Sequence, residues 1–416
     1  MPLKREARAK IAAYVQANRR ELETWWIEMV TRLVKEPTVN VLKSRIGKFP
    51  YLKVPGEETR ITNLLKPWAR QMGLDYEVHA LVPERESMII HYGRGRGKRL
   101  FVPTHSDVVP PGEGWDSDPF RVKVDATRGV VVGRGVADNK GQMAAVLLTM
   151  KLLKDCGIEL EGDFQAGIIA DEEVQSEEGI DYGLKYLINQ GLIKADFAVV
   201  PDIGGKMKTI DVAEKGRVVF VITAHGKQAH GSTPHLGINA INSMAEFLLR
   251  LKTHTFAHER HELLGTYTVN VGEITGGAAA NIVPGTCQAT IDMRLVPGMS
   301  IEGVKRGFLQ LFAGLEARFE LSVLSGTEPH QVDYRKSALV KVVQEVGASV
   351  RGETPHLIGM GGNTYAKHLF FGAGIEAIGY SAGDDEAMHQ INEFASISEH
   401  VDLARAFAEI AIEMVG

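Results

Sequence analysis

The chain has 416 residues, of which 44% are hydrophobic and 24% charged, and its formal net charge is −5. This is an ordinary globular composition, and the length predicts more than one domain because single cores rarely grow beyond about 250–300 residues. A slightly acidic chain without long basic runs argues against a nucleic-acid partner. No stretch approaches the roughly 18 uninterrupted apolar residues of a membrane-spanning helix, so no membrane partner is expected.

Two features predict a cytoplasmic location. The N-terminal sequence MPLKREARAKIAAYVQ carries charges throughout and lacks the apolar core of a signal peptide. The two cysteines, Cys156 and Cys287, lie far apart, and neither has a second cysteine at metal-ligand spacing. We interpret both as buried thiols in a reducing compartment.

The first half of the chain alternates between strands and helices. Apolar residues at helical spacing predict one helix over 5–35 and another over 57–72. A third helix is expected at 141–153. Short apolar runs predict strands at 87–92, 99–105, 163–170 and 196–201. This alternation indicates an α/β domain with a partly parallel sheet that is covered on both faces.

The pattern changes after Asp202. Strand-like runs follow at 216–224, 266–274, 286–294 and 319–324, with helical patterns near 236–252 and 301–317. Four strands and two helices in so short a stretch predict a two-layer α/β unit. From Arg335 the chain returns to helix, and the last helix is expected over 397–415. The predicted organisation is a first domain over 1–213, an inserted domain over 214–325, and the rest of the first domain over 326–416.

Histidine and acidic residues follow the predicted strands, where open α/β sheets place their sites. His105 and Asp107 come at the end of one strand, and a metal-binding imidazole usually donates its second N–H to a carboxylate. A capping pair at a strand end is the alternative. Asp171, Glu172 and Glu173 follow another strand, and acids this close raise one another's pKa unless cations offset them. A solvated loop explains the three acids equally well.

Three further residues complete the pattern. Asp138 lies in a glycine-rich segment before a helix, where it could cap that helix or bridge two cations with its two oxygens. Asp202 follows an apolar strand, and His389 lies in a late acidic segment, although a single late histidine is more often structural. Together, two histidines and three carboxylates suit two zinc-like ions that share one bridging carboxylate.

These segments resemble the co-catalytic, dinuclear zinc metallopeptidases, a family that includes acetylornithine deacetylase, succinyl-diaminopimelate desuccinylase, carboxypeptidase G, aminoacylase and the cytosolic dipeptidases. The resemblance covers nearly the whole chain after about residue 50. The matching motifs are THSDVVPPGEGWDSDPF, GRGVADNKGQMAA, IIADEEVQS, VVPD, GKQAHGSTPHLGINAI, ANIVPGTCQATIDMRLVPG, GGNTYAK and AMHQINE. The resemblance implies a zinc-peptidase-like catalytic domain with an inserted two-layer α/β dimerisation domain.

The resemblance also implies a role for each candidate residue. One metal would be held by His105, Asp138 and Asp202. The other would be held by Asp138, Glu173 and His389, so that Asp138 bridges the pair. The peptide bond after Asp138 is expected to be cis.

Four more expectations follow from the same resemblance. Glu172 would be the general base, and Asp107 would orient His105. His230 would reach the active site of a partner subunit and polarise the scissile carbonyl, whereas the simpler interpretation is that it caps a helix. The positions that contact substrate are matched by Asn281, Arg294, Gly362 and Asn363, and arginine suits a carboxylate because it binds bidentately.

The implied activity is cleavage of an amide bond in a small peptide by a homodimer that carries two divalent ions per chain. Zinc is expected, although cobalt and manganese suit the same ligands. Asp202 favours a dipeptidase or aminopeptidase, because the deacylase branches usually place Glu there, and GGNTYAK also resembles the dipeptidase pattern. The size of the inserted domain argues against a dipeptidase, because the monomeric dipeptidases of this family carry a larger insertion. The alternatives are a deacylase of N-acyl amino acids and a non-catalytic binding homologue, which would have lost a ligand or the base.

Overall fold

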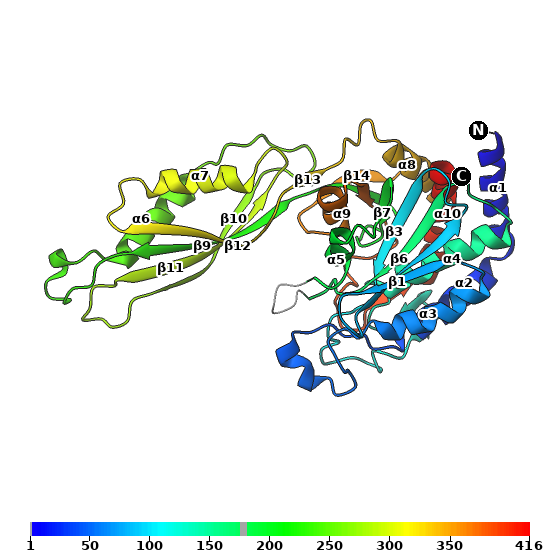
Figure 1. Cartoon of the computed structure of the whole chain (residues 1–416), viewed down its shortest axis with the longest axis horizontal. Coiled ribbons are helices and arrows are strands. Elements are labelled where there is room, and N and C mark those ends of the chain that lie inside the picture. The colour runs from blue at the N-terminus through cyan, green and yellow to red at the C-terminus, as the bar shows by residue number, and fades with distance from the viewer. Residues whose placement is uncertain (1, 175–180) are drawn as a thin grey trace. The chain divides into compact units, whose positions relative to one another are not determined.

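The computed structural model describes residues 2–174 and 181–416, which fold into two compact units (Figure 1). The first unit comprises the chain up to Val212 together with Val332–Leu357 and Thr364–Gly416. The second comprises Ala213–Gln331 and the short segment Ile358–Asn363. Within the described residues, no helix combines the length and the apolar character needed to cross a membrane.

The first unit contains most of the helices and strands. Its helices are α1 Pro2–Ala17, α2 Arg19–Val34, η1 Lys43–Lys48, α3 Thr59–Gln71, α4 Lys140–Asp155, α5 Leu184–Asn189, α8 Ala338–Arg351, α9 Tyr365–Ala373 and α10 Ile397–Val415. Its strands are β1 Tyr76–Ala80, β2 Glu86–Gly93, β3 Arg99–His105, β4 Lys123–Asp125, β5 Val130–Val132, β6 Asp163–Ile169, β7 Phe197–Val200, β15 Glu376–Gly379 and β16 Phe394–Ser396. Strands β8 Thr209–Glu214 and β14 His356–Met360 lie where the chain passes between the units.

A mixed sheet forms the centre of the first unit. Its strands follow the order β1–β2–β6–β3–β7–β15–β8. Strand β3 is parallel to both β6 and β7, and β15 is parallel to β7, whereas β1, β2 and β8 run antiparallel to their neighbours. The carboxyl ends of β3, β6 and β7 therefore meet at one edge of the sheet, where α/β proteins bind their ligands.

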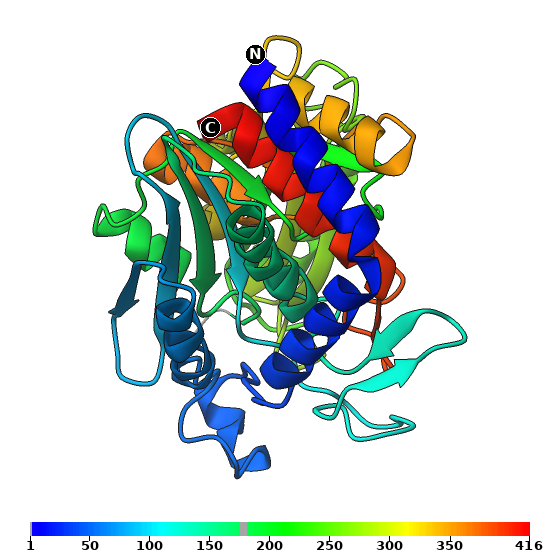
Figure 2. The same cartoon turned by 90° about the vertical axis from the view of Figure 1, so that its right-hand side faces the viewer.

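Helices cover both faces of this sheet, as the alternating sequence pattern predicts. On one face α4 and α10 pack against β3 and β6, and Figure 2 shows α1 (blue) running beside α10 (red). On the other face α5 and α9 pack around Phe101, Ile169, Leu187 and Leu369. Alternate residues of β3 are buried on opposite faces, which explains why the strand reads as one continuous apolar run.

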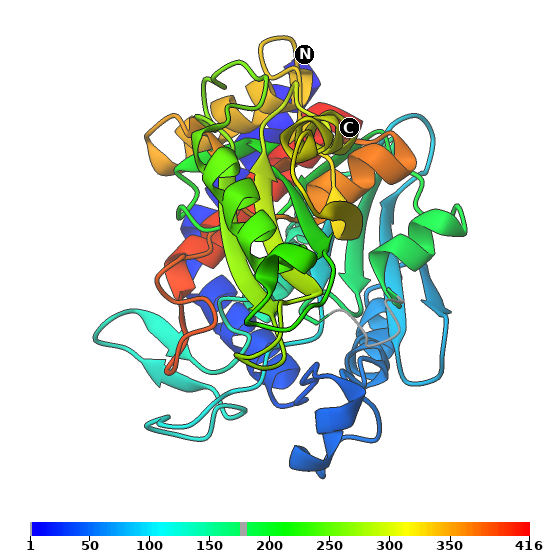
Figure 3. The same ribbon diagram turned by 90° about the vertical axis from the view of Figure 1, so that its left-hand side faces the viewer.

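The second unit is a two-layer α/β structure, which confirms the predicted four-stranded sheet with two helices. Its strands are β9 Gly216–His225, β10 Thr268–Gly276, β11 Thr286–Leu295 and β12 Arg318–Thr327, with the short β13 His330–Gln331. The antiparallel order is β10–β11–β9–β12. The helices are α6 Ala240–Thr253 and α7 Ile301–Phe312, with η2 Pro234–Leu236 before them (Figures 1 and 3). Asn239 and Ser300 are the N-cap residues that precede α6 and α7, and their side chains accept main-chain N–H groups of these helices.

One predicted element is wrong. The helix expected over 5–35 is interrupted at Asn18, which separates α1 from α2. The Asn18 backbone leaves the helical region, with φ −113° and ψ 20°, and its side-chain amide donates to the carbonyl oxygen of Tyr14 at 2.9 Å. Asparagine competes with the backbone in this way, and apolar periodicity alone does not reveal it.

Candidate metal centre

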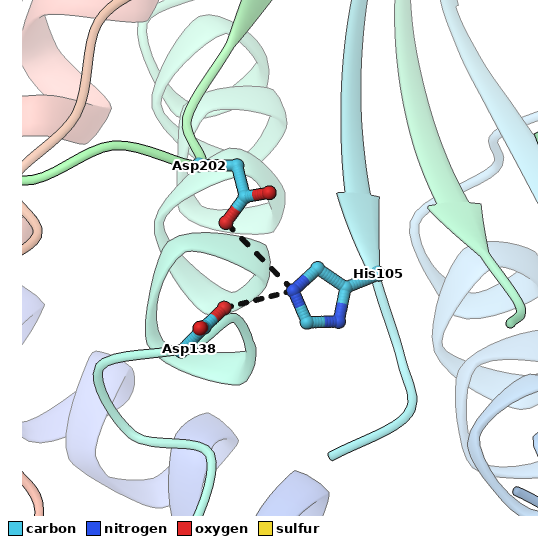
Figure 4. Close-up of side chains that lie close together, drawn as sticks. All are labelled: His105, Asp138 and Asp202. Atoms are coloured by element: carbon cyan, nitrogen blue, oxygen red, sulfur yellow. Dashed lines mark hydrogen bonds and ion pairs between the residues drawn. The ribbon is translucent and has the colours of Figure 1, made fainter. Parts of the chain in front are cut away.

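His105 ends strand β3 and is buried. Its Nδ1 atom lies 3.0 Å from the carbonyl oxygen of Asp107, so that nitrogen donates to the main chain. The opposite nitrogen, Nε2, lies 2.8 Å from Oδ1 of Asp138 and 3.8 Å from Oδ1 of Asp202 (Figure 4). The hydrogen bond at Nδ1 therefore leaves the Nε2 lone pair directed at two carboxylates, the arrangement that a metal-binding histidine requires.

Asp138 lies between the two candidate histidines. Its Oδ1 atom contacts Nε2 of His105, and its Oδ2 atom lies 3.0 Å from Nε2 of His389. The peptide bond between Asp138 and Asn139 is cis, as the family resemblance implies. Asn139 also donates from its amide to Oδ1 of Asp202 at 3.2 Å. Because the two Asp138 oxygens face different histidines, this side chain has the geometry of a bridging ligand.

Glu173 and His389 form the second half of the cluster. Nε2 of His389 lies 3.1 Å from Oε2 of Glu173. The candidate ligand atoms of Asp138, Glu173 and His389 all lie within 4.8 Å of one another, and so do those of His105, Asp138 and Asp202. A third overlapping group joins His105 to Glu172 and Glu173. The end of the IIADEEVQS motif, at 175–176, lies outside the described residues.

Asp107 contacts the same cluster through a different set of atoms. Its carboxylate accepts the main-chain N–H groups of Glu172 and Glu173 at 3.0 to 3.1 Å, and its Oδ1 atom is 3.5 Å from Nδ1 of His105. The hydrogen bond that orients His105 thus comes from the Asp107 main chain, whereas the Asp107 side chain holds the segment that carries both glutamates.

A buried polar network behind that segment is not apparent from the sequence. Asn40 donates to Oδ2 of Asp107 at 2.8 Å and to Oδ1 of Asp171 at 3.0 Å. Arg85 binds Asp171 at 2.7 Å and Glu58 through two hydrogen bonds at 2.6 and 2.8 Å. Only the acidic run at 171–173 gave any signal of this network, because its other members come from separate loops and strands.

The charges of the cluster indicate a site for cations. Burial and then the charge of Asp138 raise the pKa of Glu173 to about 7, and burial likewise raises the pKa values of Glu172 and Asp202. Hydrogen bonds to Asp138 and Glu173 raise the pKa of His389 to about 10. Burial, and then the charges of the neighbouring carboxylates, therefore disfavour the charged forms of these three acids. Divalent cations would relieve the same repulsion, so the residues present fit a metal pair.

The other expected site residues all belong to the second unit. His230 is exposed, and its Nδ1 atom lies 2.7 Å from Oγ of Ser232. It does not cap α6, because Asn239 does so. The N–H of Gly231 donates to the carbonyl oxygen of Asn281 at 2.8 Å, which places the loops of His230 and Asn281 side by side.

Arg294 lies close to the glycine segment that also matches the family pattern. Its guanidinium donates to Asp292 at 2.9 Å and to the carbonyl oxygen of Gly361 at 3.2 Å. Gly362 and the exposed Asn363 follow directly. The second unit therefore brings Arg294 together with 361–363, and separately brings His230 together with Asn281.

Known proteins are similar to this chain in sequence and in fold. The peptidase dimerisation domain of the M20 family matches residues 212–318. A metallohydrolase of Methanocaldococcus jannaschii is 28% identical over 79% of this chain and 84% of its own length. An acetylornithine deacetylase of Erwinia tasmaniensis is 29% identical over 77% of this chain and 82% of its own. A solved tripeptidase of Staphylococcus aureus has a TM-score of 0.72 at 23% identity, covering 94% of this chain and 98% of its own, which shows the common fold.

Proposed function

Because this chain belongs to the M20 family of metal-dependent hydrolases, we propose that it cleaves the amide bond of a short peptide with the help of two divalent ions, expected to be zinc. One observation carries the proposal. Two histidines and three carboxylates form two overlapping groups that share Asp138. Imidazole and carboxylate ligands around a shared carboxylate suit a pair of zinc-like ions.

The residues divide naturally between the two ions. His105, Asp138 and Asp202 would hold one ion, and Asp138, Glu173 and His389 would hold the other. The main-chain hydrogen bond at Nδ1 of His105 keeps Nε2 aimed at the first position. When bound, such ions lower the pKa of a shared water and polarise the carbonyl group of the substrate.

Glu172 is the residue best placed to move protons. Within the described part of the chain its carboxylate makes no hydrogen bond, whereas Glu173 contacts His389 at 3.1 Å. Burial raises the pKa of Glu172 well above its usual value, and a raised pKa suits a carboxylate that must first accept a proton and then release it. Glu172 would take a proton from the attacking water and pass it to the leaving nitrogen.

The second unit would form a homodimer through strand β10 and helix α6. Strand β10 is an edge strand, and all of its residues are exposed, Val269, Val271 and Ile274 among them. Ile241 and Leu249 of α6 are also exposed. An unpaired apolar edge invites pairing with a second copy. In such a dimer the exposed His230 would serve the partner's site and stabilise the oxyanion, while Asn281, Arg294, Gly362 and Asn363 would contact substrate.

We also place the protein in the cytoplasm. Cys156 and Cys287 are both free and buried, which fits a reducing compartment.

The substrate is proposed to be a dipeptide or a similarly short peptide. Asp202 in place of the glutamate of the deacylase branches favours this class. A deacylase of N-acyl amino acids is the second candidate, because acetylornithine deacetylases and a succinyl-diaminopimelate desuccinylase are among the sequence relatives. Arg294 suits the carboxylate of either class of substrate.

Metal analysis combined with two substrate panels tests the proposal. Purified protein should bind up to two zinc ions per chain, lose turnover when they are removed by a strong chelator, and regain it with added zinc. Turnover should be faster on dipeptides than on N-acetyl and N-succinyl amino acids. The reverse preference would make the chain a deacylase. Full activity without metal, or no turnover on either panel by metal-loaded protein, would contradict the proposed activity.

A further inference from the structure

Glu393 is a buried carboxylate to which neither the residue pattern nor the family motifs assign a role. Its Oε1 atom accepts the main-chain N–H of Ala137 at 2.7 Å and of Asp138 at 3.0 Å. Its Oε2 atom accepts the N–H of Gly135 at 3.0 Å and the guanidinium of Arg134 at 2.6 Å. Four donors thus converge on one carboxylate, and three of them are backbone groups of the segment that ends at the proposed bridging ligand.

The same glutamate lies on the loop that carries the second histidine. Glu393 follows His389 by four positions and immediately precedes β16, which pairs with β5 in the register Phe394 with Val132. The carbonyl oxygen of Glu393 also accepts the N–H of Gly133 at 3.0 Å. Strand pairing therefore fixes the backbone of Glu393, and its side chain reaches across to the backbone of Asp138.

Arg134 extends this link to a third loop. It is buried, donates to the carbonyl oxygens of Pro110 at 3.4 Å and Pro111 at 3.2 Å, and lies 5.3 Å from the ring centre of Trp115. The charge of Arg134 and the three backbone donors offset part of the cost of burying Glu393, although burial still raises the pKa of its carboxyl to about 7. The segments at 110–115, 134–138 and 389–393 are thereby held in one arrangement.

We propose that Glu393 is a positioning residue that fixes Asp138 against His389. It would thereby set the affinity for the ion held by Asp138, Glu173 and His389, which is called the second ion below. The inference rests on the proposed two-metal function. If Glu393 served only as the buried partner of Arg134, it would need no hydrogen bonds to the backbone of the Asp138 segment. Here both oxygens also bind the backbone of the Asp138 segment, one of them at the N–H of Asp138 itself, and Oδ2 of Asp138 lies 3.0 Å from Nε2 of His389.

Metal titration of a Glu393→Gln variant tests this inference. Glutamine keeps the size of the side chain but replaces one acceptor oxygen with an NH₂ group, which must then face N–H donors. Loss of a residue that orients a metal ligand typically weakens metal binding by about 10- to 100-fold. We expect a loss of that size for the second zinc ion, measured on metal-free protein by competition with a chromophoric chelator.

Glu409→Gln is the matched control. Glu409 is also buried and binds arginines, Arg8 at 3.0 Å and Arg405 at 2.8 Å, but it lies within α10 and contacts neither metal-carrying segment in these bonds. The control variant should bind both zinc ions like the unmodified protein. The visible absorption of the cobalt-loaded protein gives a second readout, which should change for Glu393→Gln and not for Glu409→Gln.

The outcomes separate the inference from the function on which it rests. If the unmodified protein binds no second ion, the two-metal function fails. If it binds two ions and Glu393→Gln binds both with unchanged affinity and an unchanged cobalt spectrum, only the role of Glu393 is refuted. If Glu393→Gln does not fold, Glu393→Asp decides, because it keeps the charge beside Arg134 but shortens the side chain. Unchanged second-ion affinity in Glu393→Asp would overturn the inference.

Discussion

The carboxylate of Asp107 accepts the main-chain N–H of Glu172 on both of its oxygens, at 3.1 and 3.0 Å. Oδ2 also accepts the N–H of Glu173 at 3.0 Å, while the carbonyl oxygen of Asp107 faces Nδ1 of His105 at 3.0 Å. One residue at the end of β3 therefore holds a proposed metal ligand through its main chain and the proposed base through its side chain.

This division of contacts predicts the behaviour of an Asp107→Asn variant. The new NH₂ group must face a main-chain N–H of the glutamate segment, so Glu172 should shift from its working position. We expect kcat to fall by about 10- to 100-fold. The ion beside His105 should be retained, because the His105 hydrogen bond goes to a main-chain oxygen that the substitution leaves in place.

Steady-state kinetics and metal analysis on the same preparation measure the two effects. Asp163→Asn is the matched control, since Asp163 is also a buried aspartate on the central sheet but pairs with His91. Unchanged kcat in Asp107→Asn would show that the bonds to the glutamate segment have no catalytic consequence.

The adjacent glutamates should separate by readout. Glu172→Gln removes the proposed base without removing a proposed ligand, so turnover should fall by roughly two or more orders of magnitude while metal content stays nearly constant. Glu173→Gln should instead release the ion shared with His389. The two variants control for each other, because each makes the same chemical change at neighbouring positions. Metal loss in Glu172→Gln together with metal retention in Glu173→Gln would mean that the two roles are exchanged.

The sequence predicted the location of the candidate site better than its internal contacts. His105 ends β3, Glu172 and Glu173 follow β6, and Asp202 follows β7. Since β3 is the parallel neighbour of both β6 and β7, residues at the carboxyl ends of these strands meet at one side of the sheet for topological reasons. A one-dimensional pattern of apolar runs carries that information. The sequence also marks Asp138 and His389 as candidates, and the family motifs assign them to the two ions.

The buried bonds that hold these residues could not be predicted in the same way. Arg134 and Glu393 are 259 positions apart, and neither sequence spacing nor composition links them. Asp107 contacts His105 through its main chain and the glutamate segment through its side chain. This division depends on where strand β3 ends in space. Such contacts depend on tertiary packing, which the local pattern does not encode.

A buried histidine predicts how stability depends on pH. Burial lowers the pKa of His400 to about 4, and its ring packs 4.7 Å from that of Trp26 while Nδ1 donates to the carbonyl oxygen of Ser396 at 2.7 Å. Between pH 6.5 and about 4 the unfolded chain binds a proton at this residue that the folded chain does not. The stability that His400 contributes as a neutral side chain should therefore be lost as pH falls through that window, by about 3 kcal/mol in total.

Urea unfolding followed by tryptophan fluorescence measures this effect, since Trp25, Trp26, Trp68 and Trp115 all belong to the first unit. His400→Asn keeps a donor for Ser396 and cannot titrate. Its free energy of unfolding should be lower at pH 7 but should fall less between pH 6.5 and 4 than that of the unmodified protein. His235→Asn, at an exposed position, is the control. Parallel curves for His400→Asn and the unmodified protein would refute the prediction.

The proposed dimer predicts complementation between two inactive variants. His230→Ala lacks the exposed histidine of the second unit, and Glu172→Gln lacks the base of the first. If His230 serves the partner's site, a mixed dimer has one site with an intact base and an intact partner histidine, and one site with both defects. Random exchange between equal amounts of the two variants makes half of the dimers mixed, and each mixed dimer has one working site out of two. About a quarter of the activity of the unmodified protein should therefore return.

Differently tagged chains establish that exchange has occurred before activity is measured. His235→Ala provides the control, because it removes an exposed histidine from the same unit, and that variant should remain active by itself.

Recovery is impossible if His230 acts within its own subunit, since every chain would then carry one defect in its own site. Recovery is equally impossible if the protein is a stable monomer. Mixed dimers that are recovered by pull-down but remain inactive would therefore refute the role of His230 in the partner's site while leaving the dimer itself intact. Two results together would refute the dimer. Differently tagged chains of the unmodified protein would form no mixed dimers after prolonged incubation at high concentration, and the protein would have a monomeric mass in solution.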